Sequence, residues 1–390
     1  MTKTMLLLCL LACACGGRYE GIPVKYHALL DDALARAGAN RGELEGALAG
    51  ATGAEKEGVA FLVSYMPTRD LASTRGADLL LNTRLAYAAR ERHAWAGSVP
   101  DSIFLNDVLP YAILNETREN WREDFNRRFT PLVAGCTTLE EAIRAVNKHV
   151  RDELKVDYNT RRRKPDQSPS ESIEQGMASC SGLSILLTDA FRSIGIPSRV
   201  AGVANWHDDR GNHTWCEVWL DGKWYFTEYY PEELDRAWFL ADAGRAIPGN
   251  RDYAVWASSF KPTGNSFPLV WDRSIEYVPA VDVSRHYIDV YQSVSSRQEA
   301  DGNHVRLRVR AFAAGSRLPE DRLKVNVDVF RGTEQVGGGS TAGPTRDVNE
   351  VLSFLVEKNR EYTLKYWLPD GTGKEVTVAV KDSPVEVTLD

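Results

Sequence analysis

Hydrophobic residues recur at helical spacing along the first part of the chain, from about Val24 to Glu153. Apolar positions three and four residues apart predict helices in YHALLDDALARAG (26–38), LLLNTRLAYAARERHAW (79–95) and TTLEEAIRAVNKHVRDEL (137–154). In the last of these, Thr138 is followed three residues later by Glu141, which is the pattern of a capping box. The pattern therefore predicts a helical region at the start of the protein.

The middle of the chain changes from polar to apolar. NTRRRKPDQSPSES (159–172) is polar, basic and contains two prolines, so we expect a loop. SCSGLSILLTDAFRS (179–193) then shows helical spacing, and its helix begins at Ser179 or Cys180. Gly195 and Pro197 are typical residues to end such a helix.

Strand-like runs rich in β-branched and aromatic residues follow this helix. They are SRVAGVAN (198–205), HTWCEVWL (213–220) and WYFTEYY (224–230), and the last two are joined by Asp221-Gly222, a strong hairpin signal. From about Ser284 to Asp390, six or seven further strand-like runs are separated by turn residues, as in a β-sandwich. The whole pattern predicts an α+β protein with an all-β domain at its end.

The first residues, MTKTMLLLCLLACACGG, combine one lysine, an apolar run too short to span a bilayer, and small residues. This pattern predicts an export signal over residues 1–15. Leu10-Leu11-Ala12-Cys13 also resembles a bacterial lipobox, in which Cys13 would receive the lipid. We expect a lipid-anchored protein facing the periplasm or the cell exterior, and plain secretion after Ala12 or Ala14 is the alternative.

Charge and cysteine content narrow the remaining choices. The formal net charge is -7 with both signs mixed along the chain, which argues against a nucleic-acid partner. Besides three cysteines in the leader, the chain has Cys136, Cys180 and Cys216. Three thiols cannot all pair within one chain, so at least one is expected to be free in an oxidising compartment.

Cys180 is the thiol best placed for chemistry. A cysteine at a helix N-terminus lies near the positive end of the helix dipole and near unpaired backbone N–H groups, which favour the reactive thiolate. The alternative is a buried structural cysteine. A thiol needs a base before it becomes a nucleophile in catalysis.

His213 is the candidate base, and Glu228 is the candidate carboxylate that orients it. If Asp221-Gly222 forms a two-residue turn, opposed residues have numbers summing to 443, so Trp215 faces position 228. Glu228 is then a diagonal neighbour of His213, at roughly 7–8 Å between Cα atoms. Glu217 lies on the same face as His213 but four residues along the strand, at about 13 Å, too far to orient the imidazole.

A zinc site made of His213 and Cys216 is a competing interpretation. Their separation suits a metal pair on a loop or a helix. On a strand, however, an odd separation directs the two side chains to opposite faces, so we expect no metal and no other cofactor. Cys216 is expected to be buried on the other face, and Cys136 is either buried or paired with it.

Taken together, these motifs resemble the transglutaminase-like superfamily, whose members are relatives of papain-type thiol enzymes. The resemblance rests on GMASCSGLSILLTDAFRSIGIPSRVAGV and NHTWCEVWLDGKWYFTE, and it covers roughly residues 138–242. It places Cys180, His213 and Glu228 at the family's catalytic positions. One departure is that the third position is usually Asp in the family, whereas here the carboxylate is one methylene further from the backbone.

The resemblance implies a domain order and an oxyanion site. The expected order is a helical region (16–130), a papain/transglutaminase-like core (131–275) and the β-sandwich (276–390). The backbone N–H of Cys180 would stabilise an oxyanion, and Gln175 is a candidate second donor, although it could equally be a loop residue. Trp206 and Trp215 are candidate cleft residues, with core or surface packing as the alternative.

The resemblance also implies attack of Cys180 on a carboxamide or acyl carbon of a peptide or protein, through a thioester. Hydrolysis and transfer to an amine need the same residues, and an exported, water-rich setting favours hydrolysis. A non-catalytic surface binding module is the third hypothesis. Under any of these hypotheses the sandwich domain is expected to bind a polymer or a protein, or to brace the rest of the chain, and the membrane to be reached only through the lipid anchor.

Overall fold

The computed structural model describes residues 19–230 and 233–390, and the chain divides into two units, Met1–Arg84 and Leu85–Asp390. The predicted signal sequence and the lipid acceptor Cys13 lie outside the described residues. Within the described parts of the chain, no helix combines the length and the apolarity needed to cross a bilayer. The predicted α+β class is confirmed.

The first unit is helical, as its sequence pattern predicts. Its helices pack through fully buried leucines such as Leu30, Leu44 and Leu62. The helical elements of this unit are η1 (Val24–Tyr26), α1 (His27–Arg36), η2 (Gly38–Asn40), α2 (Arg41–Gly50), α3 (Glu55–Tyr65), α4 (Thr68–Leu71) and the start of α5 (Gly76–Arg92). The predicted helical region 16–130 continues beyond this unit into the second one.

Helices also begin the second unit, and one of them carries the predicted capping box. The side chain of Thr138 accepts a hydrogen bond from the backbone N–H of Glu141, and the Glu141 carboxylate accepts one from the N–H of Thr138. This box begins α9. The elements before the helix that begins at Cys180 are α6 (Ala94–Gly97), α7 (Asp101–Asp107), α8 (Trp121–Phe129), η3 (Thr130–Val133), α9 (Leu139–Leu154), β1 (Asp157–Tyr158), α10 (Pro169–Gln175) and β2 (Met177–Ala178).

The segment predicted as a loop, 159–172, is irregular only up to Ser168. There a second capping box, formed by Ser168 and Glu171, begins helix α10. Pro169 takes the first helical position, where its missing N–H costs nothing. The two prolines were therefore a poor sign of continuous loop, because one of them starts a helix.

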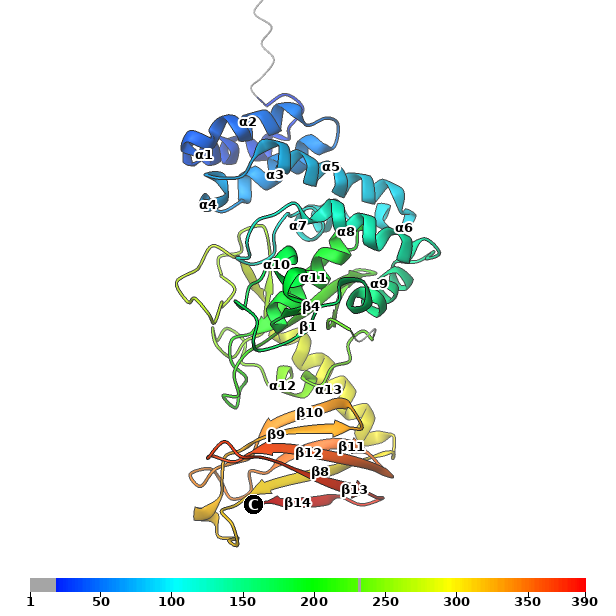
Figure 1. Cartoon of the computed structure of the whole chain (residues 1–390), viewed down its shortest axis with the longest axis vertical. Helices are drawn as coiled ribbons and strands as arrows, with labels where there is room; N and C mark the ends of the chain where they lie inside the picture. The colour runs from blue at the N-terminus through cyan, green and yellow to red at the C-terminus, as the bar shows by residue number, and fades with distance from the viewer. Residues whose placement is uncertain (1–18, 231–232) are drawn as a thin grey trace, which may run out of the picture. The chain divides into compact units, whose positions relative to one another are not determined.

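A five-stranded antiparallel sheet forms the centre of the second unit, in the order β5-β4-β3-β6-β7. Helix α11 (Cys180–Ser193) packs against one face of this sheet and is buried on almost every side, including at polar residues such as Asp189 and Arg192 (Figure 1). The strands of the sheet are β3 (Ser198–Val203), β4 (His213–Leu220), β5 (Lys223–Thr227), β6 (Trp256–Ser258) and β7 (Ala280–Asp282).

The predicted hairpin and its register are confirmed. Leu220 pairs with Lys223 and Cys216 pairs with Thr227, so each opposed pair sums to 443. Asp221 and Gly222 have φ values of 49° and 84°, the left-handed conformations that a type I′ turn requires at both central positions. The turn sequence thus decides which side chains lie beside one another at the other end of the hairpin.

The C-terminal domain is a β-sandwich of two sheets, as predicted, but it starts later than the sequence indicated. Its sheets have the orders β10-β9-β12-β13 and β11-β8-β14, with a shared apolar core. Its strands are β8 (His304–Ala311), β9 (Asn326–Arg331), β10 (Glu334–Ser340), β11 (Leu352–Glu357), β12 (Arg360–Trp367), β13 (Gly373–Val380) and β14 (Val385–Leu389).

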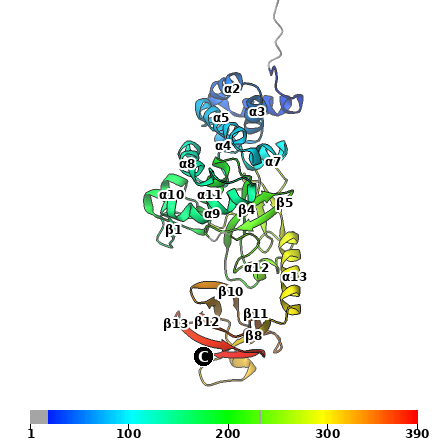
Figure 2. The same cartoon turned by 90° about the vertical axis from the view of Figure 1, so that its right-hand side faces the viewer.

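Residues 276–303, which the sequence analysis assigned to the sandwich, belong elsewhere. Strand β7 extends the central sheet, and residues 284–300 form helix α13 (Ser284–Ala300) rather than a strand (Figure 2). Tyr287, Val290 and Val294 recur at helical spacing and contact the core beneath the sheet. Turn residues flank this segment, so its helical period was mistaken for part of the strand pattern.

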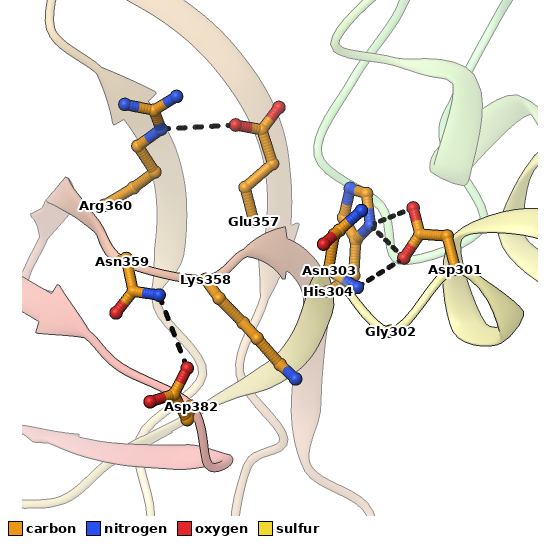
Figure 3. A pocket seen from close by; sticks show the side chains of 9 residues that line it. All are labelled: Asp301, Gly302, Asn303, His304, Glu357, Lys358, Asn359, Arg360 and Asp382. Atoms are coloured by element: carbon orange, nitrogen blue, oxygen red, sulfur yellow. Dashed lines mark hydrogen bonds and ion pairs between the residues drawn. The ribbon is translucent and has the colours of Figure 1, made fainter.

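One end of the sandwich carries an open polar hollow of about 500 Å³. Figure 3 shows that its charged side chains bond to one another, for example Asp301 with His304 and Asn359 with Asp382. The hollow is lined by Asp301, Gly302, Asn303, His304, Glu357, Lys358, Asn359, Arg360 and Asp382. Several of these polar groups are paired with one another, and the hollow gives no specific sign of a ligand.

Candidate active site

Cys180 is the first residue of helix α11, as the sequence predicted. Ser179 caps the helix: its hydroxyl oxygen accepts a hydrogen bond from the N–H of Gly182 at 3.0 Å, and its hydroxyl donates to the carbonyl of Pro165. The cap leaves the sulfur of Cys180 next to the first turn of the helix, where backbone N–H groups have no partner within the helix. The backbone N–H groups of Ser181 and Thr214 lie near this sulfur and help to lower the pKa of the thiol.

Strand β4 brings His213 to this helix start. The hydroxyl groups of Ser181 and Thr214, 3.1 Å apart, join the beginning of the helix to the beginning of the strand. His213 lies beside the thiol of Cys180, close enough for each group to shift the pKa of the other. The structure therefore brings the two predicted residues together, and their catalytic role stays a prediction.

Glu228 follows the end of strand β5 and completes the arrangement. Its Oε1 lies 2.6 Å from Nε2 of His213, so the other ring nitrogen, Nδ1, is the one left for the thiol. The backbone of Glu228 is held by helix α9, because Nδ2 of Asn147 donates to the Glu228 carbonyl at 2.6 Å. This hydrogen bond fixes the backbone from which the carboxylate of Glu228 reaches His213.

The electrostatics favour a thiolate and an imidazolium. Burial alone would raise the pKa of the Cys180 thiol, but the hydrogen bond and the charge of His213, with the two backbone N–H groups, lower it below its ordinary value. Burial likewise lowers the pKa of His213, but Glu228 and Cys180 outweigh it and raise that pKa to about 10. The two pKa values thus move in the directions expected of a reactive thiol–imidazole pair.

Aromatic rings enclose the imidazole. Trp215 and Trp206, both predicted as cleft residues, are buried, with ring centroids 5.7 Å and 6.2 Å from that of His213. Trp238 and Phe239 approach it more closely, at 5.0 Å and 5.3 Å. The side chains of His213 and Glu228 remain 15% and 18% exposed, so the enclosed pair still reaches solvent.

Sequence reasoning missed several of these supporting residues. Trp238 and Phe239 belong to a loop with no periodic pattern, and only their aromatic character could have drawn attention to them. Asn147 gave a usable signal: it is a polar residue on the buried face of an amphipathic helix, between Ile143 and Val150. A buried polar side chain in such a position needs a partner, and here the partner is the backbone of Glu228.

Gln175, predicted as a second oxyanion donor, lies at the C-terminus of α10. Its Nε2 donates to the carbonyl of Glu171 at 2.9 Å, and its Oε1 accepts from the N–H of Arg163 at 3.1 Å. Both ends of the amide are therefore engaged close to its own helix. Its oxyanion role stays a prediction.

Glu217 and Cys216, which lie on the same strand as His213, are buried and contribute to packing and hydrogen bonding. Glu217 is fully buried and accepts from Nε of Arg199 and from the hydroxyl of Tyr287, each at 2.7 Å. Cys216 points to the opposite face of the strand, where its thiol donates to the carbonyl of Ser184 at 3.2 Å. Burial raises the pKa of this thiol to about 12, and Cys136 and Cys216 are both free rather than paired.

A group that could hold a metal ion lies beside this site, in the described part of the chain. His207, Asp208 and Asp242 each offer one ligand atom, and these atoms lie within 4.8 Å of one another. Arg210 already forms ion pairs with both carboxylates, at 2.7 Å and 2.6 Å. The protein itself thus supplies positive charge to this cluster.

Comparison with known proteins agrees with the geometry of the site. A family model described as the transglutaminase-like superfamily matches residues 126–229, which contain Cys180, His213 and Glu228. The chain carries a transglutaminase-like domain. No curated protein matches the chain.

Two solved structures match part of the chain. One is described as a candidate cysteine protease from Cytophaga hutchinsonii, with 12% identity over 36% of this chain and 47% of that chain, and a TM-score of 0.28. The other is red sea bream transglutaminase, with 9% identity over 66% of this chain and 58% of that chain, and a TM-score of 0.28. The matched part spans less than two thirds of either protein. The fold of the transglutaminase-like domain supports a thiol enzyme.

Proposed function

We propose that the protein is an exported thiol enzyme that acts on amide bonds of peptides or proteins, with Cys180 as nucleophile, His213 as acid and base, and Glu228 as the carboxylate that orients His213. The observation that carries the proposal is that one imidazole lies 2.6 Å from the carboxylate of Glu228 and also beside the thiol of Cys180, whose pKa it lowers. Export rests on the leader sequence alone, and the lipid anchor on Cys13.

The proposed reaction starts from a Cys180 thiolate and a protonated His213. The Cys180 thiolate attacks the carbonyl carbon, and a C–S bond forms while the C–N bond breaks. Nδ1 of His213 gives its proton to the leaving amine. Water, deprotonated by the now neutral His213, then attacks the thioester carbon, the C–S bond breaks, and the carboxylic acid leaves as the thiolate–imidazolium pair is restored.

Stabilisation of the tetrahedral oxyanion falls to groups at the helix start. The N–H of Cys180 belongs to the first turn of α11, where it is free to donate to a substrate oxygen. The helix dipole favours negative charge at the same place. Hydrolysis is the preferred outcome because the pair retains solvent exposure, and transfer to an amine uses the same thioester.

Alkylation of the mature protein with iodoacetamide across pH, located by peptide mass, tests the proposal. We expect Cys180 to react well below the pH at which an ordinary thiol reacts, and to lose this behaviour in His213→Ala. Cys136 is the internal control, because burial and Glu141 raise the pKa of its thiol. Labelling of Cys180 like a free thiol in the wild-type protein would contradict the assignment.

Turnover is measured next on a peptide library and on casein, with water or a fluorescent primary amine as acceptor. Release of new amino termini indicates hydrolysis, and incorporation of the amine indicates transfer. Cys180→Ala should abolish either activity, while Cys136→Ser should retain it. A reactive Cys180 with neither activity would favour the alternative of a surface binding module.

A further inference from the structure

Two irregular segments supply Trp206, Trp238 and Phe239, which form the aromatic walls around His213. The loop between β3 and β4, residues 204–212, carries Trp206, and the segment before α12 (Leu240–Ala243) carries Trp238 and Phe239. The rings of Trp206 and Trp238 meet edge to face, with centroids 6.2 Å apart. Neither segment belongs to the sheet; their aromatic rings pack in the apolar core beside Trp215, and an ion-pair network also joins the two segments.

Arg210 joins the two segments. Its Nε lies 2.7 Å from Oδ2 of Asp208, which is two residues after Trp206. Its Nη2 lies 2.6 Å from Oδ1 of Asp242, which is three residues after Phe239. A planar guanidinium can hold two carboxylates in a fixed relation, which the single point charge of a lysine cannot do.

This ion-pair network is buried rather than superficial. The side chains of Arg210, Asp208 and Asp242 are 7%, 15% and 1% exposed. Burial raises the pKa of Asp242 to about 6, while the charge of Arg210 opposes that rise. Removing one partner from such a network leaves an uncompensated buried charge, so the geometry of all three groups is strongly coupled.

The β-sandwich completes the network through the edge strand β10. The backbone N–H of Ser340 donates to Oδ2 of Asp208 at 3.0 Å, which uses a donor that an edge strand would otherwise leave unpaired. The strand approaches the guanidinium closely at Gly338, where an added Cβ would lie 2.9 Å from Nη1 of Arg210. Only a residue without a side chain leaves this space.

We propose that Arg210 is a positioning residue for the Cys180–His213 pair, and that strand β10 of the sandwich holds the Asp208–Arg210–Asp242 network in its working geometry. The inference rests on the proposed function. Arg210 touches neither the thiol nor the imidazole; it acts through the aromatic walls. Loss of the network lets Trp206 and Trp238 move, water reach the imidazole, and the hydrogen bond to Cys180 weaken.

The test is the midpoint pH of Cys180 alkylation in Arg210→Met and Arg210→Lys. We expect Arg210→Met to raise the midpoint by about half to one pH unit, a three- to tenfold loss of thiolate at lower pH, and Arg210→Lys to raise it less. Arg236→Met is the matched control, because Arg236 also pairs with β10, at Glu334, but both side chains are at least half exposed, at 57% and 50%.

Ser340 offers a milder pair of variants if Arg210→Met fails to fold. Ser340→Pro removes the N–H that reaches Asp208, and proline is tolerated on edge strands where the N–H faces outward. Ser340→Ala keeps that N–H and removes only the hydroxyl, which donates to Asn326. The proposal predicts a raised midpoint in Ser340→Pro and a wild-type midpoint in Ser340→Ala.

Thermal unfolding of the same variants separates positioning from stability. A lower melting temperature with an unchanged alkylation midpoint in Arg210→Lys and Ser340→Pro overturns the positioning role. The wild-type protein distinguishes this failure from failure of the proposed function. If wild-type Cys180 reacts like a free thiol, both proposals fall, whereas normal wild-type reactivity with unaltered variants removes the role of Arg210 alone.

Discussion

Oε1 of Glu228 lies 2.6 Å from Nε2 of His213, although the two residues are fifteen positions apart in the chain. The Asp221-Gly222 turn brings them together by fixing the register of the hairpin. This contact raises the pKa of His213 against the effect of burial, and it leaves Nδ1 to the thiol. The predictions below follow from this relationship and from the groups around it.

Activity should depend on pH through two groups. The pKa of Cys180 is lowered, so the thiolate and its contribution to stability are lost as the pH falls through this lowered value. The pKa of His213 is raised, so the imidazolium is present at low pH and is lost as the pH rises through about 10. We expect kcat/KM to rise at a pH below the ordinary thiol value and to fall near pH 10. A circular dichroism spectrum at each pH controls for unfolding.

Glu228→Gln should lower activity by about 10²-fold or more, because a neutral amide no longer stabilises the imidazolium. The alkaline limb of the pH profile should move to lower pH, since Glu228 is the strongest of the groups that raise the pKa of His213. Glu228→Asp should lower activity about tenfold, which corresponds to part of the free energy of one charged hydrogen bond. The shorter side chain should reach His213 less well, because Asn147 fixes the backbone at this position. An Asp variant as active as wild type would show that the backbone adjusts.

Ser179→Ala should weaken both the helix and the thiolate. The variant loses the cap to Gly182 and leaves the carbonyl of Pro165 without its donor, at a cost of about 1–3 kcal/mol in the free energy of unfolding. The alkylation midpoint of Cys180 should rise because the first turn is less ordered. Thr138→Ala removes the cap of α9 instead, so it should lower stability without moving the midpoint. Equal alkylation midpoints in Ser179→Ala and Thr138→Ala would contradict the link between the cap at Ser179 and the reactivity of Cys180.

Tyr287→Phe should lower stability more than it lowers reactivity. The Tyr287 hydroxyl accepts from Nε1 of Trp215 at 2.6 Å and donates to Oε1 of Glu217 at 2.7 Å, so its loss leaves the indole N–H without its acceptor and Oε1 without this donor. We expect a loss of about 2–4 kcal/mol in the free energy of unfolding, measured with denaturant. The alkylation midpoint should change little, because Trp215 still stacks on Phe239 with centroids 4.3 Å apart.

Two control variants give the smallest and the largest loss of stability expected in that experiment. Tyr291→Phe, at a partly buried position of the same helix, should leave stability within about 0.5 kcal/mol of wild type. Glu217→Gln should cost more than Tyr287→Phe, about 3–5 kcal/mol, because it leaves Arg199 buried without its counter-charge. If Tyr287→Phe matches Tyr291→Phe, the buried hydroxyl is not the link between α13 and the sheet.

Local patterns in the sequence were sufficient for the centre of the site. The glycine-containing turn determines the register of β4 and β5, and the apolar run after Ser179 determines where the catalytic helix begins. These are short-range properties, set by backbone sterics and by the period of the side chains. From them the neighbourhood of His213 and Glu228 followed, and the helix start indicated which thiol to examine.

Segment 276–303 shows where such patterns were misread. Its helical period was present in Tyr287, Val290 and Val294, but neighbouring strand signals and turn residues led to its assignment to the sandwich. The contacts of Tyr287 with Trp215 and Glu217 lie across about seventy residues of chain. A periodic pattern shows which face of a helix is buried, but it does not name the partner.

The sequence by itself determined the hairpin register, the helix that begins at Cys180, and the apolar faces that form the cores. Only the tertiary structure decided which loops surround His213, how Arg210 joins Asp208 to Asp242, and that β10 donates to this network. The reason is physical: turns and periodic faces are encoded within a few residues, whereas loop contacts depend on how distant segments pack. No local pattern specifies which carboxylates pair with a buried charge such as that of Arg210.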